Sequence, residues 1–81
     1  MNYCFISGKI ISDIDYKFML EKKKYAKAKM IIELDSKNEV IIIAYNKIAD
    51  YIYRKMRNNM YIIIEGRIVK DMVEAIRICN I

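Results

Sequence analysis

The sequence contains no histidine, proline or tryptophan, and only two glycines and two cysteines among its 81 residues. Cys4 and Cys79 lie near opposite ends of the chain, so neither the spacing of a zinc site nor a Cys-x-x-Cys redox motif is present. Both thiols are therefore expected to be reduced and buried. Because a catalytic histidine, a glycine-rich phosphate loop and a metal-ligand cluster are all absent, we expect no enzymatic activity, no metal and no cofactor.

Targeting and membrane-spanning segments are also missing from the sequence. Residues 1–7 lack the basic start and the long apolar run of a signal peptide. The longest apolar stretches are interrupted by charges well before the roughly 20 residues that a membrane helix needs. We therefore expect a cytoplasmic protein without a membrane partner, folded as a single domain that spans residues 1–81.

Positive charge is concentrated in one segment of the chain. The net charge is +5, and the segment from Glu21 to Lys29 holds five lysines and one glutamate, so that it alone carries +4. Such a segment favours a polyanionic partner, because binding releases the counterions condensed on that partner. A solvated lysine-rich loop is the alternative interpretation, and charge alone does not decide between the two.

Apolar and polar residues alternate with a period of two over most of the chain, which is typical of β-strands with one buried face. The first strand is predicted as one long, bent strand from Asn2 to about Leu20, in which Gly8 allows coiling or the close approach of another backbone. The second runs from Tyr25 to Leu34, and a tight turn at 35–38 joins it to a third from Glu39 to Tyr45. The inward side chains predicted for these strands are Cys4, Ile6, Ile10, Ala26, Ala28, Met30, Ile32, Val40, Ile42 and Ala44.

The period changes to that of a helix after the third strand, with Asn46 as the predicted N-cap and Asn58-Asn59 at the end. Two further strands follow, from about Met60 to Lys70 and from Met72 to Cys79. This order fits an all-β fold, a five-stranded closed barrel with one helix between strands three and four. The helix is expected to bury Ile48, Ala49, Ile52, Tyr53 and Met56 and to expose Lys47, Asp50, Arg54 and Arg57, and the fourth strand to bury Ile62, Ile64, Gly66 and Ile68.

Five segments carry motifs that occur together in one family: the opening strand 2–10, Asp13 with the pair Lys17-Phe18, the Ala-x-Ala stretch 26–30, the run 42–49 that enters the helix, and the Glu-Gly-Arg segment 62–68. In this order and spacing they resemble the DNA-binding domain of bacterial single-stranded DNA-binding proteins over nearly the whole chain. The resemblance implies an OB fold, subunits paired through the first strand, and strand aromatics on which bases stack.

The sequence departs from this family in four respects. The turn at 35–38 is tight where the family usually has a long loop that grips DNA, and Asn46 stands where the family often has glycine. Tryptophan is absent. The sequence ends at Ile81 without the acidic-aromatic tail of the family, so recruitment of other proteins through such a tail is not expected.

The candidate binding surface is a basic sheet face that bears aromatic side chains. Tyr45 matches a base-stacking position of the family and ends an outward row of the third strand, and Lys47 follows it as a phosphate contact. Lys27 and Lys29 project on the same side if the hairpin pairs as predicted. The other candidates are aromatic residues that flank the lysine-rich turn, of which at least one is expected in the core, and further lysines: Tyr16, Phe18, Tyr25, Lys9, Lys22, Lys23 and Lys24.

The function predicted from these features is sequence-tolerant binding of single-stranded DNA in replication, repair or recombination, with RNA as an open alternative. A homodimer or homotetramer is expected, because Tyr3, Phe5 and Ile11 form an apolar edge of the first strand, opposite its core row. The competing hypothesis is an OB-fold protein-interaction or assembly module, similar to primosomal proteins, which would use the outward row of Ile41, Ile43 and Tyr45.

Overall fold

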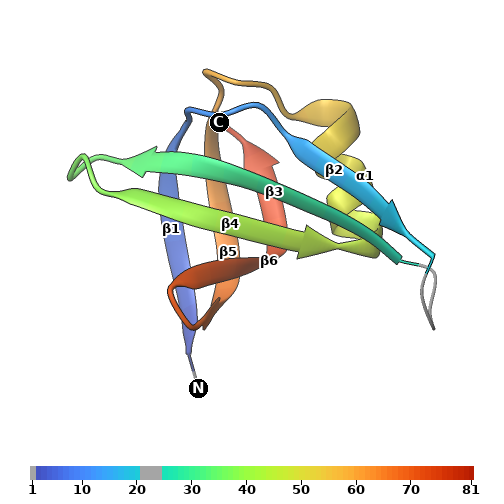
Figure 1. Cartoon of the computed structure of the whole chain (residues 1–81). Coiled ribbons are helices and arrows are strands. Elements are labelled where there is room, and N and C mark those ends of the chain that lie inside the picture. Colours follow the sequence, from blue (N-terminus) through green and yellow to red (C-terminus); the bar gives the residue numbers. More distant parts are fainter. Residues whose placement is uncertain (1, 21–24) are drawn as a thin grey trace.

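The computed structural model describes residues 2–20 and 25–81, and its strands form a barrel with one helix beside it (Figure 1). The candidates Lys22, Lys23 and Lys24 lie outside the described residues. The helix α1 spans Asn46–Lys55. The strands are β1 Tyr3–Ile10, β2 Asp15–Met19, β3 Tyr25–Leu34, β4 Glu39–Tyr45, β5 Tyr61–Val69 and β6 Met72–Asn80.

The barrel closes because β1 has a strand on each of its two sides. It pairs with β5 from Tyr3 to Lys9 and with β3 from Gly8 to Ile10. The ring continues from β5 through β6 and β4 to β3, and only the β4–β6 pairing within it is parallel. With β1 and β2 counted as one strand, this is the predicted five-stranded OB barrel with its helix between strands three and four.

The prediction of one continuous strand from Asn2 to Leu20 is wrong at residues 11–14, which belong to neither β1 nor β2. There the backbone N–H of Ile11 donates to the carbonyl of Ile31 at 2.9 Å. The N–H of Ile31 in turn donates to Ser12 Oγ at 2.8 Å. These two hydrogen bonds hold a corner against β3, after which β2 pairs with the other half of the same strand. Alternation continues through this corner although the β-ladder does not.

Gly8 lies where β1 and β3 meet to close the ring. A Cβ atom built on Gly8 would overlap the carbonyl oxygen of Glu33 and lie 3.1 Å from its carbonyl carbon. Glycine is therefore required here by the close approach of another backbone, as predicted from the sequence.

Aliphatic side chains fill the interior, and the predicted alternation accounts for most of them. The inward residues of β3 and β4 from Ala26 to Ala44 follow the expected period, and α1 covers this side of the barrel through contacts with β3, β4 and β6. The fully buried large side chains are Ile10, Met30, Ile32, Ile42, Ile52, Met56, Ile62 and Ile64.

None of the helical structure in residues 2–20 and 25–81 has the length and apolar character that a membrane crossing requires.

Three side chains expected in the interior are exposed instead. Ile68 is 45% exposed, because it lies near the end of β5, two residues before the turn into β6. Tyr53 is 56% exposed, because it lies at the margin of the helix–sheet contact and stacks on Tyr16 of β2. Cys79 is exposed because alternation in β6 turns its neighbour Ile78 inward.

Candidate nucleic-acid interface

The outward side chains of β2, β3 and β4 form two transverse rows, because residues paired across a sheet point to the same face. In one row Lys17 of β2 lies opposite Lys27 of β3, which lies opposite Tyr45 of β4. The register thus confirms that Lys27 projects beside Tyr45. Lys17, Tyr25, Lys27, Lys29 and Tyr45 are called the lysine–tyrosine face below.

The neighbouring row contains both positively and negatively charged residues. It runs from Asp15 through Lys29 and Ile43 to Glu74 of β6. Glu74 is engaged by Arg67, whose guanidinium nitrogen lies 2.9 Å from its carboxylate oxygen. This pairing neutralises Glu74 at one end of the row and leaves Asp15, beside Lys29, as the acidic residue at the other end.

Two tyrosines lie together at the end of the lysine–tyrosine face. The ring centroids of Tyr25 and Tyr45 are 6.1 Å apart and their planes are tilted by 59°. Both side chains are half-buried, so their rings are held in place while part of each remains accessible. A pair of fixed rings beside lysines offers stacking surfaces for bases and charges for phosphates.

Asn46 fixes the direction in which the chain leaves Tyr45. Its φ of 55° lies in the left-handed region, which asparagine and glycine tolerate better than other residues. Its side-chain Oδ1 accepts a hydrogen bond from the N–H of Ala26 at 3.3 Å, which ties the start of α1 to β3. The prediction of Asn46 as N-cap is wrong, because Tyr45 occupies that position and no side chain caps the helix.

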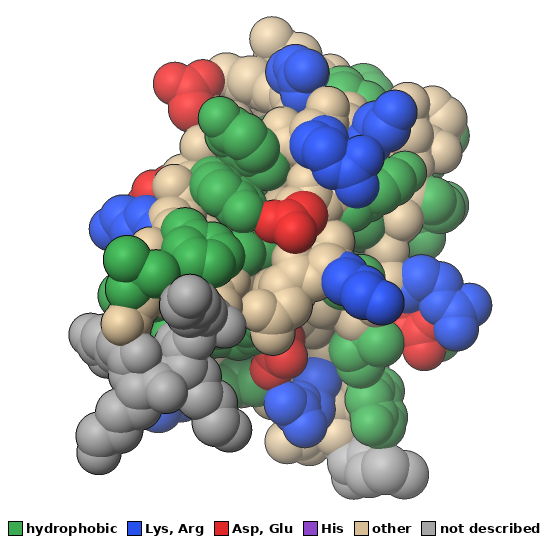
Figure 2. Space-filling model, turned by 90° about the vertical axis from the view of Figure 1, so that its right-hand side faces the viewer, with side chains coloured by type: hydrophobic (Ala, Val, Ile, Leu, Met, Phe, Trp, Pro, Cys, Tyr) green, Lys and Arg blue, Asp and Glu red, His purple; other side chains and the backbone are tan. Residues whose placement is uncertain are grey.

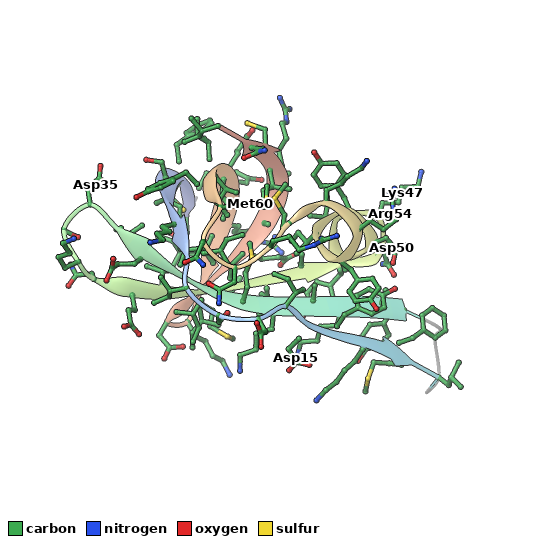
Figure 3. The ribbon with its side chains drawn as sticks, turned by 90° about the horizontal axis from the view of Figure 1, so that it is seen from above. Asp15, Asp35, Lys47, Asp50, Arg54 and Met60 are labelled. Atoms are coloured by element: carbon green, nitrogen blue, oxygen red, sulfur yellow. The ribbon has the colours of Figure 1, made fainter. Side chains whose placement is uncertain are left out.

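Lys17 is a member of this face that the candidate set from the sequence left out. A small hollow of about 130 Å³ is lined by Lys17, Lys27, Lys29 and Asp15. Three lysines and one aspartate leave this hollow with a net positive charge. Figure 3 shows Asp15 on the side of β2 and β3 opposite to the helix. The alternation of side chains along β2, together with its pairing to β3, is the pattern that could have identified Lys17 as a member of this face.

Tyr16 and Phe18 lie on the opposite side of β2 from Lys17. Tyr16 is paired with Ala28 and Phe18 with Ala26, both of which point into the barrel. Tyr16 packs against the core and Phe18, farther along the strand, is 57% exposed. The three aromatic candidates around the lysine-rich turn are therefore divided between two faces, and only Tyr25 shares one with Tyr45.

Tyr16 makes a polar contact with α1 as well as an aromatic one. Its hydroxyl donates a hydrogen bond to Asp50 Oδ1 at 2.5 Å, and its ring stacks on Tyr53 with centroids 4.4 Å apart. The hydrogen bond to this carboxylate raises the pKa of the Tyr16 phenol above its ordinary value. These contacts give Tyr16 a structural role between β2 and the helix.

The two remaining lysine candidates are separated from each other. Lys9 of β1 lies between Glu33 and Tyr61 on the outer surface. Glu33 and Lys29 are four positions apart on β3, which corresponds to about 13 Å along the strand. Lys47, in contrast, is exposed in the first turn of α1, two residues after Tyr45. Lys47 therefore follows the lysine–tyrosine face in the chain, at the start of α1, whereas Lys9 lies apart from that face.

The apolar row proposed as an assembly surface is largely covered. Ile43 is only 5% exposed, with Lys29 and Glu74 in register on its two sides. Most of the exposed large apolar side chains in the described strands belong instead to β1, β5 and β6, and Phe18 of β2 is the exception. Tyr3, Phe5, Ile63 and Cys79 are called the apolar face below.

Comparison with known proteins gives matches among solved structures alone. No family model matches the sequence, and no curated protein matches it either. The SSB domain of a Synechococcus sp. protein superimposes with a TM-score of 0.83 at 15% identity, over 96% of this chain and 93% of that one. The wild-type single-stranded DNA binding protein from Thermus aquaticus gives a TM-score of 0.89 at 19% identity. The fold is that of an SSB domain.

The match to the Thermus aquaticus protein covers all of this chain but only 40% of that one. A deletion mutant of the same protein gives a TM-score of 0.88 at 17% identity over all of this chain and 41% of that one. The SSB-type OB fold predicted from the sequence motifs is thus confirmed, although few residues are identical. What such an SSB-like fold binds depends on the side chains it carries.

Proposed function

We propose that this chain is a single-domain, non-enzymatic protein that binds single-stranded DNA with little sequence preference, through the lysine–tyrosine face together with Lys47. The observation that carries the proposal is the row of Lys17, Lys27 and Tyr45 across three strands of an SSB-type barrel, with Tyr25 beside it. Ring faces bind bases of any sequence, and lysines bind the phosphates between them.

A preference for single strands follows from the same residues. Stacking on Tyr25 and Tyr45 requires bases whose faces are accessible, which those of a duplex are not. The face carries no arginine, asparagine or glutamine with which to form bidentate contacts to base edges. Such a protein serves replication, repair or recombination in the cytoplasm. RNA satisfies the same contacts and is an arm of the test.

The tight β3–β4 turn limits the surface available to the strand. Leu34 accepts the N–H of Lys37 at 2.8 Å and donates to the carbonyl of Asn38 at 2.9 Å, so the hairpin closes within a few residues. The connection between β3 and β4 is therefore a short turn and not an extended loop. We therefore expect modest affinity and few nucleotides covered per subunit.

The direct test is fluorescence anisotropy with labelled oligothymidine, oligouridine and a hairpin duplex of equal length, each at several salt concentrations. We expect oligothymidine to bind more tightly than the duplex, with affinity that falls as salt rises. Tighter binding of the duplex, or no binding of any single strand at micromolar protein, would reject the proposal. The ratio of oligothymidine to oligouridine affinity decides between DNA and RNA.

We also propose that the chain forms a homodimer through β1, with a homotetramer as the alternative assembly. Tyr3 and Phe5 are exposed there, and Phe5 is 75% exposed. In the described residues no strand pairs with the side of β1 facing away from β5 between Tyr3 and Ser7, whereas Gly8 to Ile10 pair with β3. The edge is thus shorter than predicted, and Ile11 lies beyond it, but an apolar open edge remains suited to a second copy.

The competing function is a protein-interaction or assembly module, and the apolar face is the observation that favours it. Phe5, Ile63 and Cys79 border a hollow of about 190 Å³ on that face, beside the ion pair of Glu65 and Arg77. Light scattering together with the anisotropy titration separates the two functions. An oligomer that binds no single strand would favour the assembly module.

A further inference from the structure

Two hollows lie on the exposed side of α1, one on each side of Arg54. The first, of about 510 Å³, lies between the corner that precedes β2 and the end of the helix, and Asp13, Tyr53 and Arg57 help to line it. The second, of about 420 Å³, lies between α1 and β6 and is lined in part by Lys47. Arg54 lines both hollows. Lys47, Tyr53, Arg54 and Arg57 are called the helix track below.

Arg54 is a positive charge that an anion could reach from both hollows. Its side chain is exposed, and no carboxylate of the described residues forms an ion pair with it. Arg57, the other arginine of the first hollow, donates hydrogen bonds to the carbonyls of Arg54 at 3.3 Å and Met56 at 2.8 Å. The Arg57 guanidinium thereby offsets the negative end of the helix dipole, which would otherwise repel a phosphate there.

Tyr53 supplies an aromatic surface in the same hollow. One face of its ring is covered by the stacked ring of Tyr16, yet more than half of the side chain remains exposed. A ring supported on one face and open on the other suits a stacked base. The first hollow therefore combines an arginine with a fixed aromatic ring, which are the two kinds of contact that a nucleotide of a single strand makes.

The helix track begins where the lysine–tyrosine face ends, at the junction of β4 and α1. Tyr45 ends β4, Lys47 lies in the first turn of α1, and Arg54 lies two turns farther on the same side of the helix. Lys47 and Arg54 are seven positions apart on α1, which corresponds to a distance of about 10 Å along the helix axis. Figure 3 shows Lys47, Asp50 and Arg54 together at the helix, and Figure 2 shows Lys and Arg side chains gathered on this side of the molecule.

We infer that a single strand bound at Tyr45 continues over Lys47 onto the helix track, with a phosphate at Arg54 and a base on Tyr53. This inference rests on the proposed function and extends it to a second surface. The acidic groups nearby set its limits. Asp50 lies one turn before Arg54 on α1 and accepts a hydrogen bond from the hydroxyl of Tyr16, and Asp13 lines the first hollow. Both carboxylates weaken the attraction of the track for phosphates without removing it.

The test is the affinity of Arg54→Ala for a length series of oligothymidines. The shortest strand that binds should be held with unchanged affinity, because it occupies only the lysine–tyrosine face. Strands long enough to reach the helix should bind roughly tenfold more weakly at low salt, as expected for loss of one charged contact. The slope of log affinity against log salt should fall by about 0.7 for these strands.

Lys55→Ala is the matched control, since it removes the same charge from the next helical residue, which lines neither hollow. Asp50→Asn tests the track in the opposite direction, because it removes a negative charge and keeps an oxygen that accepts from Tyr16. It should strengthen the binding of long strands alone.

Arg54→Ala and Lys55→Ala with equal affinities at every length would overturn the helix track while leaving the proposed function intact. If Tyr45→Ala and Lys27→Ala also bind every strand as the unaltered protein does, the proposed function itself fails. Arg54 is exposed, so Arg54→Ala should keep the melting temperature of the unaltered protein, whereas Asp50→Asn weakens the hydrogen bond from Tyr16 and should lower the melting temperature slightly.

Discussion

The two halves of the barrel share one interior but differ on their outer surfaces. The outer surface of β2, β3 and β4 carries lysines and two tyrosines, whereas that of β1, β5 and β6 carries Tyr3, Phe5, Ile63 and Cys79. Both follow the same alternation, with apolar residues facing the core. The inward positions therefore define the fold in both halves, and only the outward positions differ in the kind of partner they suit.

The two halves meet at two places, where β4 pairs with β6 and, at Gly8, where β1 pairs with β3. The proposed DNA surface lies on one half and the proposed subunit interface on the other, so the two would not compete for the same side chains. The predictions below test whether a change on one half leaves the other half's property unaltered.

The largest expected effect is loss of the oligomer in Phe5→Glu. A carboxylate in place of the most exposed aromatic of the apolar face would have to be desolvated in the interface. Light scattering at micromolar concentration should fall from twice the monomer mass of 9.7 kDa to that mass itself. Phe18→Glu, at an exposed aromatic of the other half, is the control and should leave the mass unchanged. If both variants keep the mass of the unaltered protein, the apolar face is not the interface.

The next effect concerns the junction between the halves. Gly8→Ala places a Cβ atom against the Glu33 carbonyl, so β1 and β3 must separate or the variant must unfold. We expect a loss of about 1–3 kcal/mol in the free energy of unfolding, as for other overpacked sites. Urea denaturation measures it, with Ser7→Ala as a neighbouring control whose side chain is exposed. Equal stability of the two variants would show that the closure at Gly8 is not tight.

A smaller effect is expected in the salt dependence of binding. Lys27→Ala should lower the slope of log affinity against log salt by about 0.7, because one phosphate contact is lost. Lys37→Asn removes the same charge from the β3–β4 turn, where the φ of 71° is one that asparagine adopts readily. Lys37 and Tyr45 are eight positions apart, which is roughly 26 Å along an extended strand. The salt slope of Lys37→Asn should therefore equal that of the unaltered protein. Equal slopes for the two variants would assign binding to net charge alone.

The smallest effect is a dependence of stability on alkaline pH. The pKa of Tyr16 is raised in the folded chain by its hydrogen bond to Asp50, so folding favours the protonated phenol. Its contribution is fully present below the ordinary tyrosine pKa of about 10 and is lost as pH rises through the higher folded value. The melting temperature should therefore fall less steeply between neutral and strongly alkaline pH for Tyr16→Phe than for the unaltered protein. Parallel curves for the two proteins would contradict the hydrogen bond.

Most of the fold was predictable because its residues obey simple periods. The bounds of β3 and β4 agree with the predicted strands, since both have one fully apolar row and the polar turn at 35–38 separates them. The corner at residues 11–14 was not predictable from alternation, because it depends on hydrogen bonds from Ile11 and to Ser12 that involve a distant strand. The prediction that Tyr53 is buried was wrong for a similar reason, since Tyr53 lies on α1 and its stacking partner Tyr16 comes from β2.

The candidate site was only partly predictable. Tyr45, Lys27 and Lys29 could be grouped because a tight turn fixes the register of one hairpin. The division of Tyr16 and Phe18 from Tyr25 depends on how β2 pairs with β3, and the connection between those strands lies outside the described residues. The hollows around Arg54 involve α1, the corner before β2, and β6, whose proximity no local pattern contains.

The central claim is that Tyr45 binds a base, and oligothymidine titration of Tyr45→Ala and Tyr45→Phe tests it most directly. Tyr45→Ala should weaken binding by about 1–3 kcal/mol, which is roughly ten- to a hundredfold, whereas Tyr45→Phe keeps the ring face and should bind nearly as well as the unaltered protein. The salt slope of Tyr45→Ala should stay unchanged, because no phosphate contact is lost. Thermal melts of both variants accompany the titration. Undiminished affinity of Tyr45→Ala, or a loss matched by collapse of its melting temperature, would contradict the claim and make Tyr45 a structural residue of the barrel rim.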